Sequence, residues 1–248
     1  TACVQSSPKM SSADRYAGPP RSRCRAGRFQ AGVYRQTARP LPPNPNEPEG
    51  GKMRIALIGG TFDPVHAGHL IGAERTADSL NLDRVLFVPA ATPPHKQNRK
   101  ISEAAHRVNM LRLALRGNPR FDLLLDEIER GGASYTVDTV QAVRSRLNPE
   151  DKLFLVVGAD NLIDFDTWKD WRRIADICRI AGLARPGSEQ ARRMVERKHP
   201  ELKIEWIEMP LIDISSTFIR SLVAEGGSIR YLAPENVESY IHDNGLYR

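Results

Sequence analysis

The amino-acid sequence predicts an α/β protein with one parallel sheet covered by helices on both faces, a Rossmann-like arrangement. From residue 53 onward, short apolar runs typical of buried strands alternate with longer stretches typical of helices. Strands that alternate with helices are joined by right-handed crossovers and therefore run parallel. We see no internal repeat, so residues 53–248 are assigned to a single domain.

The first predicted strand, residues 54–58, is apolar and ends at Gly59-Gly60, as a buried strand before a turn does. Further strands are predicted at 85–89, 121–125, 152–157, 180–184 and 203–208. Helices are predicted at 66–80, 102–116 (with Ser102 as cap), 134–147, 171–179, 189–198, 215–225 and 234–243. Ligands of such sheets bind at the carboxyl ends of the strands, where the strand order reverses. Residues that directly follow strands are therefore the candidates for a site.

Residues 1–52 differ in composition from the rest of the chain. They hold 8 of the 18 prolines, nine Lys or Arg and three Asp or Glu, so this segment carries the whole net charge of +6. A segment so poor in apolar residues cannot offset its ordering entropy, and we expect a disordered extension. Met53 directly precedes the first strand, so we expect translation to begin at or near it.

The charge and cysteine content of residues 53–248 limit the function. Their 27 basic and 27 acidic residues balance, which makes nucleic acid an unexpected partner. Cys178 is the one cysteine of this part, so it has no disulfide and no cysteine-based metal site, which fits a reducing, cytoplasmic location. No apolar run approaches the roughly 20 residues of a membrane span. The sequence leaves open whether copies of the chain form a homo-oligomer.

The segment after the first strand reads Gly59-Gly-Thr-Phe-Asp-Pro-Val-His-Ala-Gly-His69. Glycines let the backbone approach a ligand, and the helix start that follows offers N–H groups to phosphate. His66 and His69 are three residues apart and share a helical face, where they can donate to phosphate oxygens. The spacing differs from the dinucleotide fingerprint, the P-loop and the zinc motif H-E-x-x-H. The ATP-binding candidates here are Gly59, Gly60, Thr61, Phe62, His66, Gly68 and His69.

A second anion-binding segment, Ile214-Ser-Ser-Thr-Phe-Ile-Arg220, follows the last predicted strand. Ser215 or Ser216 can cap the helix, and the N–H groups of that turn can hold an anion. Arg220 lies about one turn further along, on the side of Ser216 and Thr217, and its guanidinium suits a triphosphate.

The two segments together resemble the signatures of the nucleotidyltransferase superfamily with the His-x-Gly-His motif. Within it, residues from about 54 to the C-terminus resemble bacterial nicotinate-nucleotide adenylyltransferases. The resemblance implies that ATP and nicotinate mononucleotide react to give deamido-NAD and pyrophosphate in NAD biosynthesis. It implies His66, His69 and Arg220 as catalytic residues, and Mg²⁺ that binds with ATP without a set of protein ligands.

The resemblance also assigns three further segments. Lys96, in Pro93-Pro-His-Lys96, faces the nucleotide phosphates, although alone an exposed Lys is usually only solvated. Ser134, Tyr135 and Thr136 border the nicotinate ring, although the same residues could simply cap a helix. Asp160 is a candidate for another reason: it follows a strand of this fold class, where an acid commonly bonds ribose hydroxyls, although it could instead only cap the next helix. Trp168 stacks on the pyridine ring, and Trp171 is left to packing.

Two other readings stay open on the residues alone. A related enzyme could use nicotinamide mononucleotide or phosphopantetheine as acceptor, and residues 134–136 with Trp168 argue for a pyridine carboxylate instead. A nucleotide-binding or RNA-binding protein without catalysis is the reading from another class. The two intact ATP signatures and the neutral charge of residues 53–248 argue against it, while the basic extension keeps only a weak form of it open.

Overall fold

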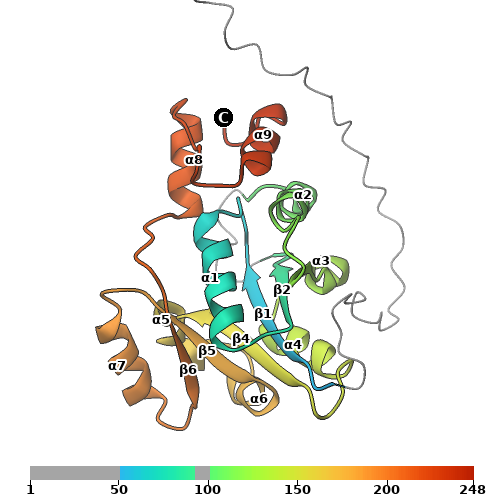
Figure 1. The fold of residues 1–248 in the computed structure, drawn as a ribbon, viewed down its shortest axis with the longest axis vertical. Helices are drawn as coiled ribbons and strands as arrows, with labels where there is room; N and C mark the ends of the chain where they lie inside the picture. Colours follow the sequence, from blue (N-terminus) through green and yellow to red (C-terminus); the bar gives the residue numbers. More distant parts are fainter. Residues whose placement is uncertain (1–50, 93–100) are drawn as a thin grey trace, which may run out of the picture. The chain divides into compact units, whose positions relative to one another are not determined.

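The strand order defines the fold: six parallel strands lie in the order β3-β2-β1-β4-β5-β6 (Figure 1). The computed structural model describes residues 51–92 and 101–248. The strands are β1 (Arg54–Gly60), β2 (Arg84–Pro89), β3 (Phe121–Leu123), β4 (Lys152–Gly158), β5 (Arg179–Ala184) and β6 (Ile204–Glu208). The order reverses between β1 and β4, so the carboxyl ends of these two neighbours open a crevice suited to a ligand. The predicted Rossmann-like class is confirmed.

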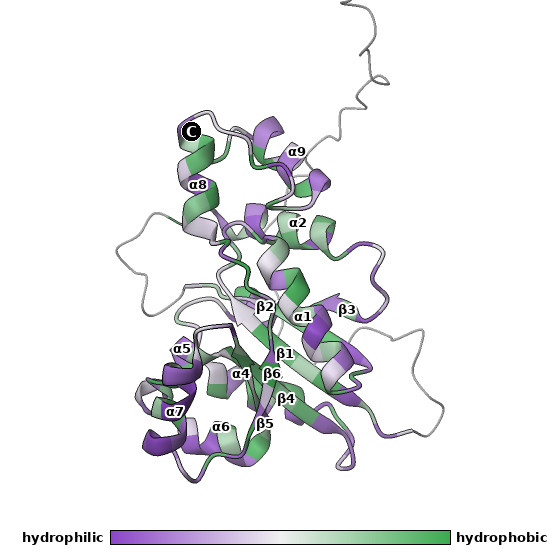
Figure 2. Cartoon of the chain, turned by 60° about the vertical axis from the view of Figure 1, so that its left-hand side comes forward, coloured by the Kyte–Doolittle hydropathy of each residue, from purple (hydrophilic) through white to green (hydrophobic). Residues whose placement is uncertain are grey.

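The strands are apolar because both faces of the sheet are covered. Ala56 and Ile58 of β1 point into one core, which α1, α2, α8 and α9 complete. Ile55 and Leu57 alternate with them and point into a second core, against α4, α6 and α7. This period of two is the geometry of a strand buried on both sides. Figure 2 shows the consequence, with hydrophobic residues concentrated on the strands and hydrophilic ones on the outer surface of α7.

Each long helix predicted from the sequence is present within a few residues of its expected ends. The helices are α1 (Ala67–Ser79), α2 (Ala104–Ala114), α3 (Asp126–Arg130), α4 (Thr136–Arg144), α5 (Ala159–Leu162), α6 (Trp171–Ile177), α7 (Glu189–Lys198), α8 (Ser216–Ala224) and α9 (Glu235–Asp243). The short helices α3 and α5 and the 3₁₀ turn η3 (Phe165–Thr167) were not predicted, because one turn carries no readable periodicity.

The predicted cap of α2 is wrong in one respect. The helix begins at Ala104 with Glu103 at its N-cap, and Ser102 lies one residue earlier. The Ser102 main-chain N–H donates to Asp63 Oδ2 (3.1 Å), and its carbonyl oxygen accepts from Arg107 Nε (3.1 Å). Tertiary partners therefore fix Ser102, and the helix start does not use it.

Several expectations lie outside the described residues. These are the extension up to residue 50, for which disorder was expected, and the segment Pro93-Pro-His-Lys96. Within residues 51–92 and 101–248, no helix is long and apolar enough to cross a membrane. All of these residues belong to one compact unit.

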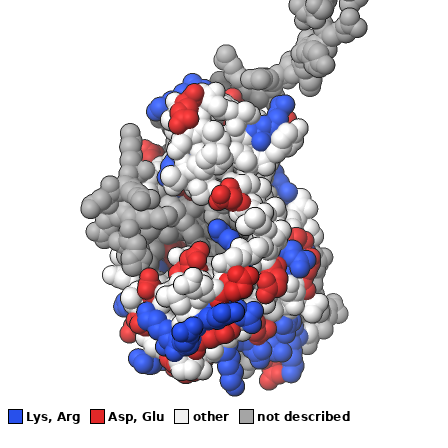
Figure 3. Space-filling view, turned by 90° about the vertical axis from the view of Figure 1, so that its left-hand side faces the viewer, with Lys and Arg blue, Asp and Glu red and all other residues white. Residues whose placement is uncertain are grey.

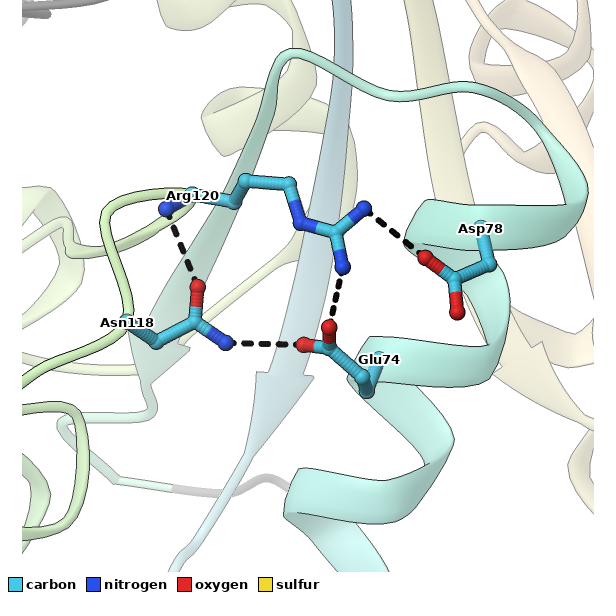
Figure 4. A network of polar contacts seen from close by, with 4 residues as sticks. All are labelled: Glu74, Asp78, Asn118 and Arg120. Atoms are coloured by element: carbon cyan, nitrogen blue, oxygen red, sulfur yellow. Dashed lines mark hydrogen bonds and ion pairs between the residues drawn. The ribbon is translucent and has the colours of Figure 1, made fainter.

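A polar network joins α1 to the start of β3 at the edge of the sheet (Figure 4). Arg120 pairs with Glu74 and with Asp78 (2.9 Å), both on α1. Asn118 Nδ2 donates to Glu74 Oε2 (2.7 Å), and Asn118 Oδ1 accepts from the Arg120 main-chain N–H (3.0 Å). One guanidinium thus pairs with two carboxylates of the same helix. The conformational entropy of the Arg120 side chain is therefore lost once for two ion pairs.

We expect Arg120→Met to lower the free energy of unfolding by about 1 kcal/mol, more than a typical exposed ion pair. The reason is that Glu74 and Asp78 would lose their common counter-charge. Urea unfolding at low and high salt measures the change, which should shrink at high salt. Arg179→Met is the control, since Arg179 is exposed and pairs with one carboxylate, that of Glu205. Equal losses for the two variants would contradict the importance of the network.

Candidate active site

Two clefts open beside the carboxyl ends of β1 and β4, where the strand order reverses. The first has a volume of about 390 Å³ and the second of about 880 Å³. Thr61, Gly158, Asp160 and Asn161 line both, so the clefts adjoin. Two ligands in these clefts would meet beside the loop that follows β1.

That loop packs tightly onto the sheet. Phe62 has φ 50°, in the left-handed region that non-glycine residues rarely occupy. Its ring turns into the core, 1% exposed, and contacts Phe87 and His69. A Cβ on Gly60 would lie 2.9 Å from this ring, which explains the glycine there. Phe62 was predicted to bind ATP, but its side chain lines neither cleft. Its ring instead packs against the imidazole of His69.

His66 and His69 stand together at the start of α1. His66 is the N-cap, and its main-chain N–H donates to His69 Nδ1 (3.2 Å). Because Nδ1 of His69 accepts, the proton of the neutral ring lies on Nε2. The centroids of the two rings are 3.7 Å apart, with their planes inclined by 33°, and both rings line the first cleft. A Cβ on Gly68 would come within 3.1 Å of His66 Nδ1, so glycine keeps room for the imidazole.

His66 is held neutral at physiological pH. Burial, and then the positive charge of Arg185, lower its pKa from 6.5 to about 4. Its Nδ1 is buried and has no hydrogen-bond partner within the described part of the chain. A neutral imidazole beside an arginine can offer a phosphate oxygen one hydrogen bond without a charge of its own.

The start of α8 completes the first cleft. Ser215 caps the helix, since its Oγ accepts from the Phe218 N–H (3.1 Å). Ser216 Oγ donates to the Pro64 carbonyl (2.9 Å), and Arg220 donates to the Asp63 carbonyl (2.6 Å) and to Thr217 Oγ1 (3.2 Å). The two predicted phosphate-binding segments, about 150 residues apart in the sequence, are therefore bonded directly to each other. Ser215, Ser216, Thr217 and Arg220 all line this cleft.

The predicted acceptor residues line the second cleft. Ser134, Tyr135 and Thr136 stand at the start of α4, and Trp168 faces them from beyond η3. Ser134 Oγ accepts from the Ala91 N–H (2.9 Å), which ties this segment to the chain after β2. The Lys169 ammonium lies 4.5 Å from the centre of the Tyr135 ring. Trp171 packs against Phe165 and His199 and lines neither cleft.

Some lining residues were missed by the sequence reasoning. Arg185 follows β5 directly and Asn161 follows β4, so the rule of inspecting strand ends could have found both. Asp213 lies in the first cleft on an irregular segment that gives no such signal. Lys96 lies outside the described residues. Gly59 and Gly60 were predicted to bind ATP, but they line the second cleft and not the first, whereas Thr61 lines both.

This geometry defines a class of protein. A parallel sheet that opens two adjoining clefts at its reversal point, one with histidines, hydroxyls and arginines and one with aromatic rings, is the framework of a nucleotide-binding α/β protein.

The comparisons with known proteins define the family. Residues 57–222 match the Cytidylyltransferase-like family. The chain is 42% identical to a probable nicotinate-nucleotide adenylyltransferase of Moorella thermoacetica, over 79% of this chain and 92% of that protein. It is 44% identical to one of Thermus thermophilus, over 79% of this chain and all of that protein. The chain therefore belongs to the nicotinate-nucleotide adenylyltransferases within the cytidylyltransferase-like family.

Solved structures share the fold. The nicotinic acid mononucleotide adenylyltransferase of Plasmodium falciparum, complexed with NaAD, is 18% identical with a TM-score of 0.62. The match covers 79% of this chain and 97% of that one.

The lowered pKa of His66 predicts acid sensitivity. The unfolded chain takes up a proton here below about pH 6.5, whereas the folded protein does so only near pH 4. Stability is therefore lost as the pH falls through this window. Between pH 7 and 4.5 we expect wild type to lose about 2 kcal/mol more than His66→Gln in urea unfolding. His242→Gln, at an exposed position on α9, is the control. Equal losses in wild type and His66→Gln would refute the buried neutral imidazole.

Proposed function

We propose that this enzyme transfers the adenylyl group of ATP to nicotinate mononucleotide, giving deamido-NAD and pyrophosphate, in NAD biosynthesis. The observation that carries the proposal is the junction of the two clefts at Thr61, Gly158 and Asp160. ATP in the first cleft and a ring-bearing mononucleotide in the second would bring the acceptor phosphate against the α-phosphate. The family membership supports the same reaction.

The chemical step needs positioning and charge stabilisation more than proton transfer. An oxygen of the acceptor phosphate attacks the α-phosphorus of ATP in line, and the bond from that phosphorus to the bridging oxygen of pyrophosphate breaks. The attacking oxygen is already ionised at neutral pH, so no general base is required. As in other phosphorus transfers, the protein contributes by alignment and by placing donors where charge develops.

The first cleft supplies those donors. In our assignment, Nε2–H of His69 and the neutral imidazole of His66 bond to triphosphate oxygens, and Arg220 neutralises the leaving pyrophosphate. Arg185 adds a second positive charge at the same cleft. Gly68, Ser215, Ser216 and Thr217 leave room for the phosphates and bond them. Lys96 is proposed as a further phosphate-binding residue.

Mg²⁺ is part of the proposal as a companion of ATP. Within the described residues, no group of three or more His, Cys, Asp or Glu could hold a metal ion. The ion would thus take its ligands from phosphate oxygens and water, as Mg²⁺ commonly does, and would supply charge neutralisation when bound.

The second cleft would recognise the acceptor. Trp168 offers a ring face to the electron-poor pyridine, and the free N–H groups at the start of α4 suit its carboxylate. The nearby Lys169 ammonium favours the acid over the uncharged amide. Tyr135 and Thr136 border the ring, and Asp160 can bond ribose hydroxyls.

Four further points remain proposals. They are the boundary near residue 53 between a disordered extension and the catalytic domain, the cytoplasmic location, assembly into a homo-oligomer, and the absence of a nucleic-acid partner. For the last, basic residues on the face that bears α7 are interleaved with acidic ones (Figure 3). Acidic side chains among the basic ones weaken the electrostatic attraction of this face to a nucleic-acid backbone.

Pyrophosphate release from MgATP, with nicotinate and nicotinamide mononucleotides as parallel acceptors, tests the reaction. We expect kcat/KM to favour the nicotinate form by roughly 100-fold, because the amide leaves the carboxylate-binding donors poorly matched. Release with the amide alone, or with phosphopantetheine alone, would move the enzyme to a related acceptor. Release with none of these would reject the proposed reaction.

His69→Ala tests the role of the histidine pair. It should lower kcat by about 100-fold while changing the Kd of MgATP little, since the donor acts mainly as charge develops. Single-turnover kinetics and calorimetric titration separate the two effects, and His242→Ala serves as the control. A variant with undiminished kcat would remove His69 from catalysis.

A further inference from the structure

Asp63, within the loop after β1, has no role in the reaction assigned above, yet it is 3% exposed and fully engaged. Its Oδ1 accepts from the hydroxyl of Tyr247 (2.7 Å), and its Oδ2 accepts from the Ser102 N–H (3.1 Å). Tyr247 is the residue before the C-terminal Arg248. One hydrogen bond therefore joins the C-terminal end of the chain to the loop that carries the catalytic histidines.

A buried guanidinium, that of Arg107, fixes the main chain on either side of this hydrogen bond. Arg107 is 1% exposed and donates to main-chain carbonyls of Thr61 (2.9 Å), Ala90 (2.8 Å) and Ser102 (3.1 Å). Burial lowers its pKa, and the negative charge of Asp63 opposes that shift. For the phenol of Tyr247 the direction is opposite: burial and then the negative charge of Asp63 raise its pKa, so its hydroxyl remains a donor. The carboxylate of Asp63 is thus held between a buried cation and a phenol.

The main chain of Asp63 and Pro64 connects this carboxylate to the residues at the start of α8. Its carbonyl accepts from Arg220 at 2.6 Å, and Arg220 lines the first cleft. The neighbouring Pro64 carbonyl accepts from Ser216 Oγ. A rotation of Asp63 would therefore move the acceptors that orient Arg220 and the start of α8.

We propose that Tyr247 is a positioning residue, which fixes Asp63 and, through its carbonyl, the guanidinium of Arg220 at the triphosphate cleft. The consequence for turnover rests on the proposed function. Tyr247 touches no substrate in this scheme. Its effect is on how well Arg220 is aligned with the triphosphate, both in bound ATP and as the pyrophosphate leaves.

The alternative is that Tyr247 only docks the C-terminal segment, whose Leu246 and Tyr247 pack on the core. The chain offers a matched control in Tyr240 on α9, whose hydroxyl bonds His106 Nδ1 (3.0 Å) and Asn109 Nδ2 (3.1 Å) on α2. Tyr240→Phe removes a half-buried interhelical hydroxyl, and its hydrogen bonds to His106 and Asn109 involve none of residues 61–64. A purely structural role predicts the same outcome for both tyrosines.

The test compares Tyr247→Phe with Tyr240→Phe in the full chain. Both variants should fold and lose similar, small amounts of thermal stability. Tyr247→Phe alone should lower kcat by about tenfold, since misplacement of a catalytic group by a fraction of an ångström is costly. The KM for the acceptor should change less than twofold. The Kd of MgATP, measured by calorimetry without any acceptor, should rise several-fold.

A double variant tests whether Tyr247 acts on kcat through Arg220. In an Arg220→Lys background, Tyr247→Phe should change kcat less than twofold, because the residue it positions is already gone. Multiplicative losses in the double variant, equal kcat losses in the two tyrosine variants, or failure of Tyr247→Phe to fold would each overturn the proposal. Absence of turnover in the wild type would instead reject the proposed function, and the MgATP titration would still test the positioning.

Discussion

The hydrogen bonds from the start of α8 to the loop after β1 are the contact on which the active site depends. Arg220 and Ser216 donate to the carbonyls of Asp63 and Pro64, across 157 and 152 residues of sequence. Without them, the histidines of one segment and the hydroxyls and guanidinium of the other would not face one cleft. The segments are polar and would cost free energy to bury unpaired, so pairing them with each other both satisfies them and sets their spacing.

The sheet provides the fixed frame for this contact. Reversal of the strand order between β1 and β4 leaves a crevice at their carboxyl ends that crossover helices do not cover. The loop after β1 enters that crevice and turns back, with the Phe62 ring as its anchor in the core. His66 is buried from solvent there, and this burial together with the charge of Arg185 lowers its pKa, so the imidazole stays neutral. A neutral imidazole avoids the desolvation cost that burial imposes on an imidazolium, and it can still donate one hydrogen bond.

Much of the fold followed from local pattern. Apolar runs that end in glycine, as at Gly59 and Gly158, predicted strands and the points where a ligand would bind. The elements that the sequence did not predict, α3, α5 and η3, are too short to show a period. The predicted cap at Ser102 was wrong because tertiary hydrogen bonds to Asp63 and Arg107 took precedence over local capping.

The sequence by itself determined the class of fold, the two segments proposed to bind phosphate and the family resemblance, since each depends on residues close together in the chain. Only the tertiary structure decided which residues share a cleft. It turned Phe62 inward, brought Arg185 to His66, and tied Tyr247 at the chain's end to Asp63 across 184 residues. Such contacts leave no periodic signal in the sequence, because they arise when separate elements pack and each buried polar group must find a partner.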